Sequence, residues 1–441
     1  MIPRNLQSAF SSLLVLASLF AGPLAGPTTA QAPAPGPEQA PQNQPAQGTG
    51  RPSLTGSAQV LEKAAEKTVE KPSREDLLKG ASTLLGRLNG TWSMFLQNPC
   101  RTGNASLGSF ATSGKLKWTF PAEGPIDSSP AIYKGVVYVG SDDHFMYAVD
   151  ERNGRMLWKR ELGDKIKSSP AVNDDILVVG CEDKKVYALD PKTGNIKWFR
   201  LTGDRVGSSP ALFDGLAYFG SWDGHVYAVR LSDGSIAWQF PAAGSEDKAG
   251  IGRITASPAL APGLLVIGSH LGSVYGISTR DGSPLWSYKT KGKIMGSPMI
   301  LNGMVYFGSW DKNLYALDLA TGALKWKFAG QETFSITPAG ANNKIFAGND
   351  DKLMYCLNAT TGKILWKTAI YSPVPLLSSS PAVAGDRLFC GSPDARVYSI
   401  DTRNGGIKWK FETQRPIISS PAVTSSGVCV GSQDGNLYMI N

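Results

Sequence analysis

The sequence contains few of the residues that build metal centres and nucleophilic active sites. Only three histidines, His144, His225 and His270, occur among its 441 residues. A metal site needs several ligands at close spacing, and a serine or cysteine nucleophile needs a base beside it. Neither arrangement is found in the sequence, so we predict no metal site and no catalytic residues.

Cysteine is equally scarce, and no two cysteines are adjacent. The five are Cys100, Cys181, Cys356, Cys390 and Cys429. Their odd number excludes complete pairing in disulfides. The last three fall within runs that predict strands, where a small buried thiol is the ordinary state even in the oxidising compartment that an exported protein reaches.

Charge of one sign is not concentrated anywhere in the chain. Charged residues make up 18% of the sequence, and the net charge of +8 is spread without a Lys/Arg block. The sequence also lacks a nucleic-acid-binding signature. We therefore predict no nucleic-acid partner and a mild preference for acidic partners.

Long apolar runs are missing beyond the N-terminus. One stretch, residues 9–24, follows Arg4 and precedes the small residues 28–30, which is typical of a signal peptide cleaved before Gln31. Gly22 and Pro23 interrupt the stretch, which is short for a membrane span of roughly 20 residues. No cysteine lies near the cleavage region to carry a lipid. We predict a signal peptide over residues 1–30, no transmembrane segment after its removal, and a periplasmic or extracellular protein without a lipid anchor.

The next residues predict a linker, a helical segment and a lead-in. Residues 31–55 are rich in Pro and Gln and predict a disordered linker. Residues 56–90 predict two helices separated by Pro72, with Ser73 as the N-cap of the second. The apolar stripe of that second helix packs either on the following domain or on another protein. Residues 91–110 form a lead-in segment.

The rest of the chain, residues 111–441, repeats a pattern of about 40 residues. Each unit has a Ser/Thr-Pro step, a Gly ten residues later that ends a β-rich run, a Tyr seven residues after that Gly, and a Trp. The prolines are Pro130, Pro170, Pro210, Pro258, Pro298, Pro338, Pro381 and Pro421. The tryptophans are Trp118, Trp158, Trp198, Trp238, Trp286, Trp326, Trp366 and Trp409.

Each unit predicts four short antiparallel strands. Small residues after the proline suit a crowded axis, and proline is tolerated where it opens a strand. A Gly that usually stands four residues before the Trp supplies the left-handed conformation of a tight turn. The Trp on the outer strand then wedges between neighbouring sheets. We predict an all-β, eight-bladed β-propeller in which the eight tryptophans have structural docking roles.

The two ends of the repeat array complete one blade. The last unit stops at Asn441, where the other units begin the turn before their outer strand. Residues 112–118 have the turn-and-Trp spacing of that missing piece and end in Trp118. We predict that this N-terminal strand pairs with the C-terminal blade and closes the ring, which removes the open edges.

The string Ala-Leu-Asp-Pro-Lys-Thr-Gly-Asn-Ile-Lys-Trp at residues 188–198 is matched with small departures in most units. It resembles the tryptophan-docking motif of PQQ-like propeller repeats, and residues 92–98 look like the lead-in of such propellers. Two branches of that family are relevant. Quinoprotein dehydrogenases are enzymes that use PQQ and calcium, and BamB-like proteins are non-enzymatic scaffolds for outer-membrane β-barrel assembly.

The enzyme branch fits poorly. Resemblance to those dehydrogenases implies a longer chain, an adjacent Cys-Cys pair over the cofactor and an Asp base beside calcium, and no adjacent cysteines occur here. We therefore predict a non-enzymatic scaffold without a cofactor, which acts as a monomeric propeller within a complex and binds a protein partner in the cell envelope. The alternatives are a PQQ- and calcium-dependent oxidoreductase and a carbohydrate- or polymer-binding propeller.

Seven units place an aspartate three residues after the strand-ending Gly. A ring of aspartates would suit calcium, but Asp is favoured in hairpin turns for its geometry alone, and we predict the turn role. These residues are Asp143, Asp183, Asp223, Asp311, Asp351, Asp394 and Asp434.

Two other loop positions vary while the repeat around them stays fixed. Two residues after the Gly stand Asp142, Glu182, Trp222, His270, Trp310, Asp350, Pro393 and Gln433. Five residues before the Pro stand Pro125, Lys165, Arg205, Arg253, Lys293, Thr333, Leu376 and Pro416. Both loops of a blade emerge on one face of a propeller, so three successive units should combine an aromatic residue with a cation.

This combination predicts a partner-binding site, because aromatic and Arg side chains anchor protein interfaces. The predicted site residues are Trp222, His270, Trp310, Arg205, Arg253 and Lys293. Ordinary surface variation, with the two tryptophans packed on neighbouring loops, is the other interpretation of the same pattern.

Overall fold

The computed structural model describes residues 92–441 except 106, 108–109, 111, 242–249 and 371–377. Every described residue lies within one compact unit, Val69–Asn441. The predicted signal peptide, linker and helical segment, residues 1–90, lie outside the described residues. Within the described part of the chain all regular elements are strands, and a search of it finds no membrane-spanning helix.

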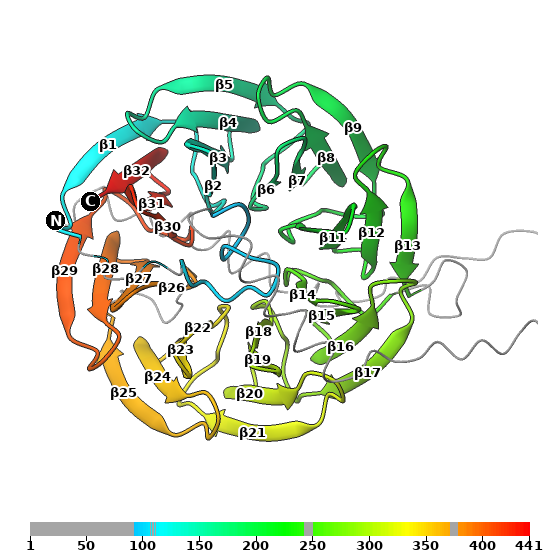
Figure 1. The fold of residues 1–441 in the computed structure, drawn as a ribbon, viewed down its shortest axis with the longest axis vertical. Coiled ribbons are helices and arrows are strands. Elements are labelled where there is room, and N and C mark those ends of the chain that lie inside the picture. Colours follow the sequence, from blue (N-terminus) through cyan, green and yellow to red (C-terminus); the bar gives the residue numbers. More distant parts are fainter. Residues whose placement is uncertain (1–91, 106, 108–109, 111, 242–249, 371–377) are drawn as a thin grey trace, which may run out of the picture. The chain divides into compact units, whose positions relative to one another are not determined.

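The strands form eight antiparallel sheets of four strands, arranged as blades around an axis (Figure 1). Blade 1 contains β2 (Ala131–Tyr133), β3 (Val136–Gly140), β4 (Phe145–Asp150) and β5 (Met156–Glu161). Blade 2 contains β6 (Ala171–Val172), β7 (Leu177–Gly180), β8 (Lys185–Leu189) and β9 (Ile196–Leu201). Blade 3 contains β10 (Ala211–Phe213), β11 (Leu216–Gly220), β12 (Val226–Arg230) and β13 (Ile236–Phe240).

The next three blades repeat this order. Blade 4 contains β14 (Ala259–Ala261), β15 (Leu264–Gly268), β16 (Ser273–Ser278) and β17 (Pro284–Lys289). Blade 5 contains β18 (Met299–Leu301), β19 (Met304–Gly308), β20 (Asn313–Asp318) and β21 (Leu324–Ala329). Blade 6 contains β22 (Ala339–Ala341), β23 (Lys344–Asn349), β24 (Leu353–Asn358) and β25 (Ile364–Ala369).

The last two blades include the closure of the ring. Blade 7 contains β26 (Ala382–Ala384), β27 (Arg387–Ser392), β28 (Arg396–Asp401) and β29 (Ile407–Glu412). Blade 8 contains β30 (Ala422–Thr424), β31 (Gly427–Gly431), β32 (Asn436–Ile440) and, as its outer strand, β1 (Leu116–Pro121). Trp118 pairs with Met439 and Phe120 with Leu437. The predicted eight blades and their closure by both chain ends are confirmed.

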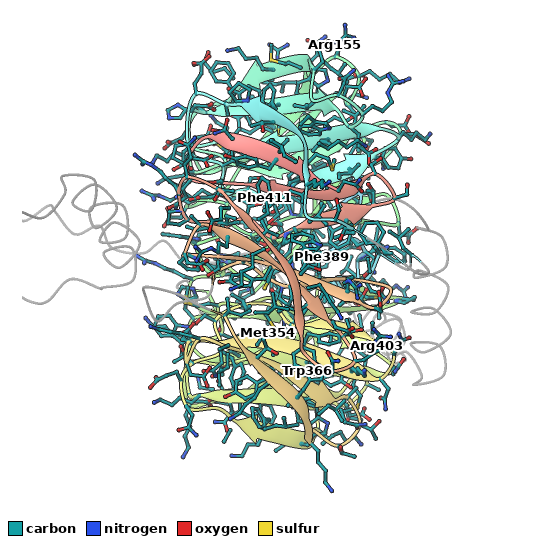
Figure 2. The ribbon with its side chains drawn as sticks, turned by 90° about the vertical axis from the view of Figure 1, so that its left-hand side faces the viewer. Arg155, Met354, Trp366, Phe389, Arg403 and Phe411 are labelled. Carbon is teal, nitrogen blue, oxygen red and sulfur yellow. The ribbon has the colours of Figure 1, made fainter. Side chains whose placement is uncertain are left out.

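Each outer-strand tryptophan joins its own blade to the next one. All eight Nε1 groups donate to a backbone carbonyl oxygen of the following blade at 2.9–3.1 Å, as Trp366 does to Thr402. Figure 2 labels Trp366 and, beside Thr402 in the sequence, Arg403 of the turn that receives this bond. In the final step Trp409 of blade 7 reaches Thr112, just before β1, so the same contact completes the ring.

The glycine of each receiving turn is required for two reasons. These eight glycines have φ between 68° and 77°, in the left-handed region. A Cβ on any of them would also lie 2.5–2.8 Å from the docked indole. The indole therefore packs on the bare backbone of the next blade, and the residues that share this geometry are Gly114, Gly154, Gly194, Gly234, Gly282, Gly322, Gly362 and Gly405.

Hydroxyl groups form a second ring close to the axis. In every blade the residue before the proline donates its backbone N–H to the side-chain oxygen of the same residue in the next blade, at 2.8–3.2 Å. The last of these bonds runs from Ser420 to Ser129 and closes the circle. This hydroxyl ring consists of Ser129, Ser169, Ser209, Ser257, Ser297, Thr337, Ser380 and Ser420.

The lead-in segment crosses the centre of the ring, where it is the blue-to-cyan trace in Figure 1. Its backbone from Trp92 to Gly103 bonds to the second residue of the innermost strand in blades 1, 2, 4, 5, 6 and 7. The buried Arg101 guanidinium reaches blades 3 and 4, where it donates to the carbonyl oxygens of Ser209, Pro210 and Pro258 at 3.0 Å. Burial lowers the pKa of Arg101 to about 9. The segment is thus hydrogen-bonded to seven blades and connects them at the centre of the ring.

Candidate partner-binding surface

In blades 3, 4 and 5 the two loops that carry the variable positions are directly bonded to each other. The backbone N–H of Trp222 donates to the carbonyl of Arg205 at 2.9 Å, and that of His270 to the carbonyl of Arg253 at 3.0 Å. In blade 5 the N–H of Trp310 donates to the carbonyl of Lys293 at 2.9 Å. The structure therefore brings the six predicted site residues together on blades 3, 4 and 5, the green to yellow-green sector of Figure 1. We call these six residues the aromatic–cationic sector.

Cations lie over both indole rings of the sector. The guanidinium groups of Arg205 and Arg253 lie 5.5 and 5.3 Å from the ring of Trp222. The ammonium group of Lys293 lies 5.3 Å from the ring of Trp310. Contacts of this kind contribute about 0.5–1 kcal/mol at exposed sites. Both indoles are half-buried, so the sector is pre-ordered while part of its surface stays accessible.

The cations of the sector differ in whether a carboxylate neutralises them. Arg205 forms an ion pair with Glu182 of blade 2 at 3.3 Å. Arg253 and Lys293 form no ion pair with any described residue. Arg253 is exposed and Lys293 half-buried. The positive charge available to a partner is therefore concentrated on blades 4 and 5.

His270 lies between these two cations and forms a hydrogen bond with a neighbouring threonine. Its Nε2 atom lies 2.9 Å from the hydroxyl of Thr255. Burial, followed by the nearby Lys293 and Arg253, lowers the pKa of His270 to about 4. The imidazole is therefore neutral at neutral pH, and its role in the sector is that of a packed polar ring.

The same loops on blades 1 and 2 carry charges that neutralise one another. Lys167 lies 3.1 Å from Asp127 and 3.5 Å from Asp142. Lys165 lies 3.2 Å from Asp142. Lys165, which occupies the position equivalent to Arg253, is therefore paired. The spacing of the sequence could not show that Lys165 is paired with a carboxylate and that Arg253, among the described residues, is not.

A polar cavity of about 280 Å³ lies on the axis beside the sector. Gly207 and Thr255 both line the wall of the cavity. Trp222 lies against Gly207, since its Nε1 atom would be 3.4 Å from a Cβ placed on that glycine, so the sector forms part of the rim. Phe95 of the lead-in segment also lines the cavity. The hydroxyl ring surrounds the cavity, and the Ser or Thr before each repeat proline is the sequence signal that could have located it.

The seven loop aspartates are engaged in turn geometry. One carboxylate oxygen of each accepts a bond of 2.5–2.8 Å from the tyrosine hydroxyl four residues later. In six of the seven, the other oxygen accepts the backbone N–H two residues later. No group of three or more His, Cys, Asp or Glu suited to a metal ion occurs in the part of the chain that the structure describes.

All five cysteines are buried and unpaired in the structure. Burial raises the pKa of Cys100, Cys181, Cys356 and Cys390 to about 12. Because the thiolate is the reactive form, these residues pack as small apolar groups.

The comparison with protein families gives one assignment. A model of the family described as outer membrane protein assembly factor BamB matches residues 103–328 and 329–441. This chain belongs to that family. The membership confirms the resemblance of the repeats to PQQ-like propellers. No curated protein sequence matches the chain.

A BamB protein, a designed protein and a dehydrogenase are among the similar solved structures. BamB from Moraxella catarrhalis is 19% identical, with a TM-score of 0.63, and the match covers 74% of this chain and 96% of that one. The computationally designed Ika8 protein is 17% identical, with a TM-score of 0.66 and coverage of 74% and 99%. A europium-containing methanol dehydrogenase is 15% identical, with a TM-score of 0.68 and coverage of 80% and 92%. At these identities the likeness shows the shared fold.

Proposed function

We propose that this chain is a non-enzymatic scaffold of the cell envelope that binds a protein partner through the aromatic–cationic sector. The sector is the observation that carries the proposal. Three successive blades depart from the repeat at two loop positions, and the departing residues are bonded and stacked on one another around an accessible rim. Family membership supports the envelope as the location, because the matched family is described as an outer membrane protein assembly factor.

The composition of the sector suits a protein interface. Interface hot spots are enriched in Trp and Arg and are stabilised when their side chains are already ordered. Trp222 satisfies both conditions, since two arginines hold its ring from neighbouring loops. Because the Trp222 side chain is already ordered in the free protein, a partner that binds it loses little side-chain entropy.

A PQQ- and calcium-dependent oxidoreductase is the alternative, and the described residues do not fit its cofactors. Calcium takes six to eight oxygen ligands, commonly including several carboxylates. Among the described residues that line the cavity, Asp127 is the only carboxylate, and Lys167 and Gln433 already hold it. An absorbance scan after addition of PQQ and calcium tests this alternative, which the appearance of a bound quinone spectrum would favour.

Capture of partners from envelope extract tests the scaffold. The double variant Trp222→Ala/Arg253→Ala should weaken capture by about 2 kcal/mol, because two anchors are lost. The matched control is Arg415→Ala at the equivalent loop of blade 8, which should capture partners like the parent protein. Equal capture by all three proteins would contradict a binding role for the sector.

A further inference from the structure

We propose that the aromatic–cationic sector receives an acidic segment of its protein partner, with carboxylates on Arg253 and Lys293 and a partner side chain or chain end entering the axial cavity. This inference rests on the proposed function and adds the chemistry of the partner. It follows from three features of the described part of the rim: two cations without a carboxylate partner there, a buried indole N–H without an acceptor there, and a polar cavity on the axis.

Arg253 and Lys293 favour a negatively charged group on the partner. Arg253 and Lys293 lie on neighbouring blades, on either side of His270, and neither has a carboxylate among the described residues. The depressed pKa of His270 reports the same local excess of positive charge, after the larger effect of burial. Arg253 is already oriented by its contact with Trp222, so its planar donor fork is ready to bind a carboxylate in bidentate fashion.

The neutral hydrogen-bond donors of the rim and the cavity favour hydrogen-bond acceptors on the partner. The Nε1 atom of Trp222 is buried and has no hydrogen-bond partner among the described residues. A buried donor without an acceptor costs about 1–3 kcal/mol, which an acceptor on a ligand would recover. Deeper in the cavity, each hydroxyl of the ring accepts a backbone N–H and donates no bond to the described residues. A hydroxyl keeps one donor proton when it accepts, so the wall offers donors to whatever enters.

The size and closure of the cavity limit what enters. Its volume of about 280 Å³ lies at or below the range of about 300–1,000 Å³ that is usual for small-molecule pockets. Phe95 of the lead-in segment lines the cavity, and the backbone of that segment bonds to the innermost strands of six blades. A side chain or a chain terminus therefore matches the size of the cavity.

The same features favour an acidic peptide over a nucleic acid. Binding to a duplex depends on many phosphate contacts, whereas within the sector, as far as the structure describes its surroundings, two cations lack a carboxylate partner. Single-stranded nucleic acids stack their bases on aromatic rings. The ring of Trp222 is already covered by Arg205 and Arg253, so it is a poor platform for a base.

Fluorescence anisotropy with labelled peptides tests the inference on the full chain. A Glu-rich peptide should bind at least about tenfold more tightly than the same peptide with every Glu replaced by Gln, and added salt should weaken its binding. The variant Arg253→Gln/Lys293→Gln should lose about tenfold or more of this affinity. Lys165→Gln, which removes the lysine of blade 2 that is paired with Asp142, should change it by less than about twofold.

Several outcomes would overturn the inference. Equal binding of the Glu and Gln peptides would remove the charge requirement, and an equal loss with Lys165→Gln would remove the location. An unfolding curve for Arg253→Gln/Lys293→Gln that matches the parent protein's shows that the fold is intact. Equally tight binding of a DNA oligonucleotide, lost in the same variant, would identify a general polyanion site instead.

The inference and the proposed function can fail separately. If neither peptide binds while Trp222→Ala/Arg253→Ala still abolishes capture from envelope extract, the sector binds a partner and the acidic chemistry is wrong. If the Glu peptide binds as expected while capture is unchanged, the acidic site exists and the envelope partner binds elsewhere.

Discussion

Blade 3 contains two tryptophans in contrasting settings. Trp238 is 8% exposed, donates to the carbonyl of Thr279 at 2.9 Å and packs on Gly282 of the next blade. Trp222 is half-buried at the rim of the axial cavity, lies between two arginines, and its indole nitrogen has no hydrogen-bond partner among the described residues. The first is repeated in every blade, whereas the second position changes from blade to blade.

The contrast shows how a repeat protein separates stability from recognition. The perimeter ring of Trp and Gly is the same eight times because each blade must meet the next in the same way. The rim is free to vary because its backbone bonds come from main-chain groups, which every residue except proline supplies. Changes at the two tryptophans should therefore affect different properties of the protein.

Alanine at the two tryptophans of blade 3 gives the largest expected difference. Trp238→Ala should lower the free energy of unfolding by about 3–5 kcal/mol, because it removes a large buried ring between two blades. Trp222→Ala should lower it by no more than about 1 kcal/mol. Urea denaturation measures both. Similar losses for the two variants would break the distinction between perimeter and rim.

Replacement of Arg101 tests whether the centre also stabilises the ring. Arg101→Met should lower the free energy of unfolding by about 3 kcal/mol, because it leaves buried carbonyl oxygens of blades 3 and 4 without a donor. Arg155→Met, at the exposed turn labelled in Figure 2, is the control and should have an effect within about 0.5 kcal/mol. An equally small effect of Arg101→Met would assign the stability to the perimeter alone.

Two glycine substitutions sharpen the account of the perimeter. Gly135 and Gly282 have similar positive φ values, 78° and 75°, but only Gly282 has an indole against it. Gly135→Ala should cost about 1 kcal/mol from backbone strain alone, and Gly282→Ala should cost about 2 kcal/mol more because its Cβ meets Trp238. Thermal unfolding compares them. If the two variants lose the same stability, the Trp238 indole shifts to accommodate the added Cβ, and its contact with the turn is looser than the geometry indicates.

Acid should expose the smallest difference, which lies at the rim. The pKa of His270 is about 4 in the folded protein, below the usual value of about 6.5, so the unfolded chain binds the proton more readily. Wild-type stability should therefore fall as pH drops from about 6.5 toward 4, and His270→Gln should remove roughly 1–2 kcal/mol of that loss at pH about 4.5. The two proteins should differ least above pH 7. Parallel stability curves across this range would contradict burial of a neutral imidazole.

The fold could be predicted in detail because each blade repeats one local solution. The spacing of Pro, Gly, Tyr and Trp fixed the strand order, and the early Trp118 indicated that the two ends share a blade. The six residues of the aromatic–cationic sector were predicted from their departure from the repeat. The structure brings them together, and whether they bind a partner stays a prediction.

Other features of the rim were not visible in the sequence, because they depend on pairs far apart along the chain. Nothing in the spacing distinguishes Lys165, which Asp142 neutralises, from Arg253, which no described carboxylate neutralises. The contacts of Trp222 with its two arginines and the depressed pKa of His270 likewise arise from the packing of adjacent loops.

The sequence by itself determined the repeat, the number of blades and the closing strand, since these follow from local turn and strand preferences counted along the chain. Only the tertiary structure decided what surrounds the axis. Bending eight blades into a circle brings Ser420 within 2.9 Å of Ser129 and places Arg101 beneath blades that begin more than a hundred residues later. Which charges are neutralised and which donors remain free is set by that closure, because electrostatic and hydrogen-bond partners are chosen by distance in space.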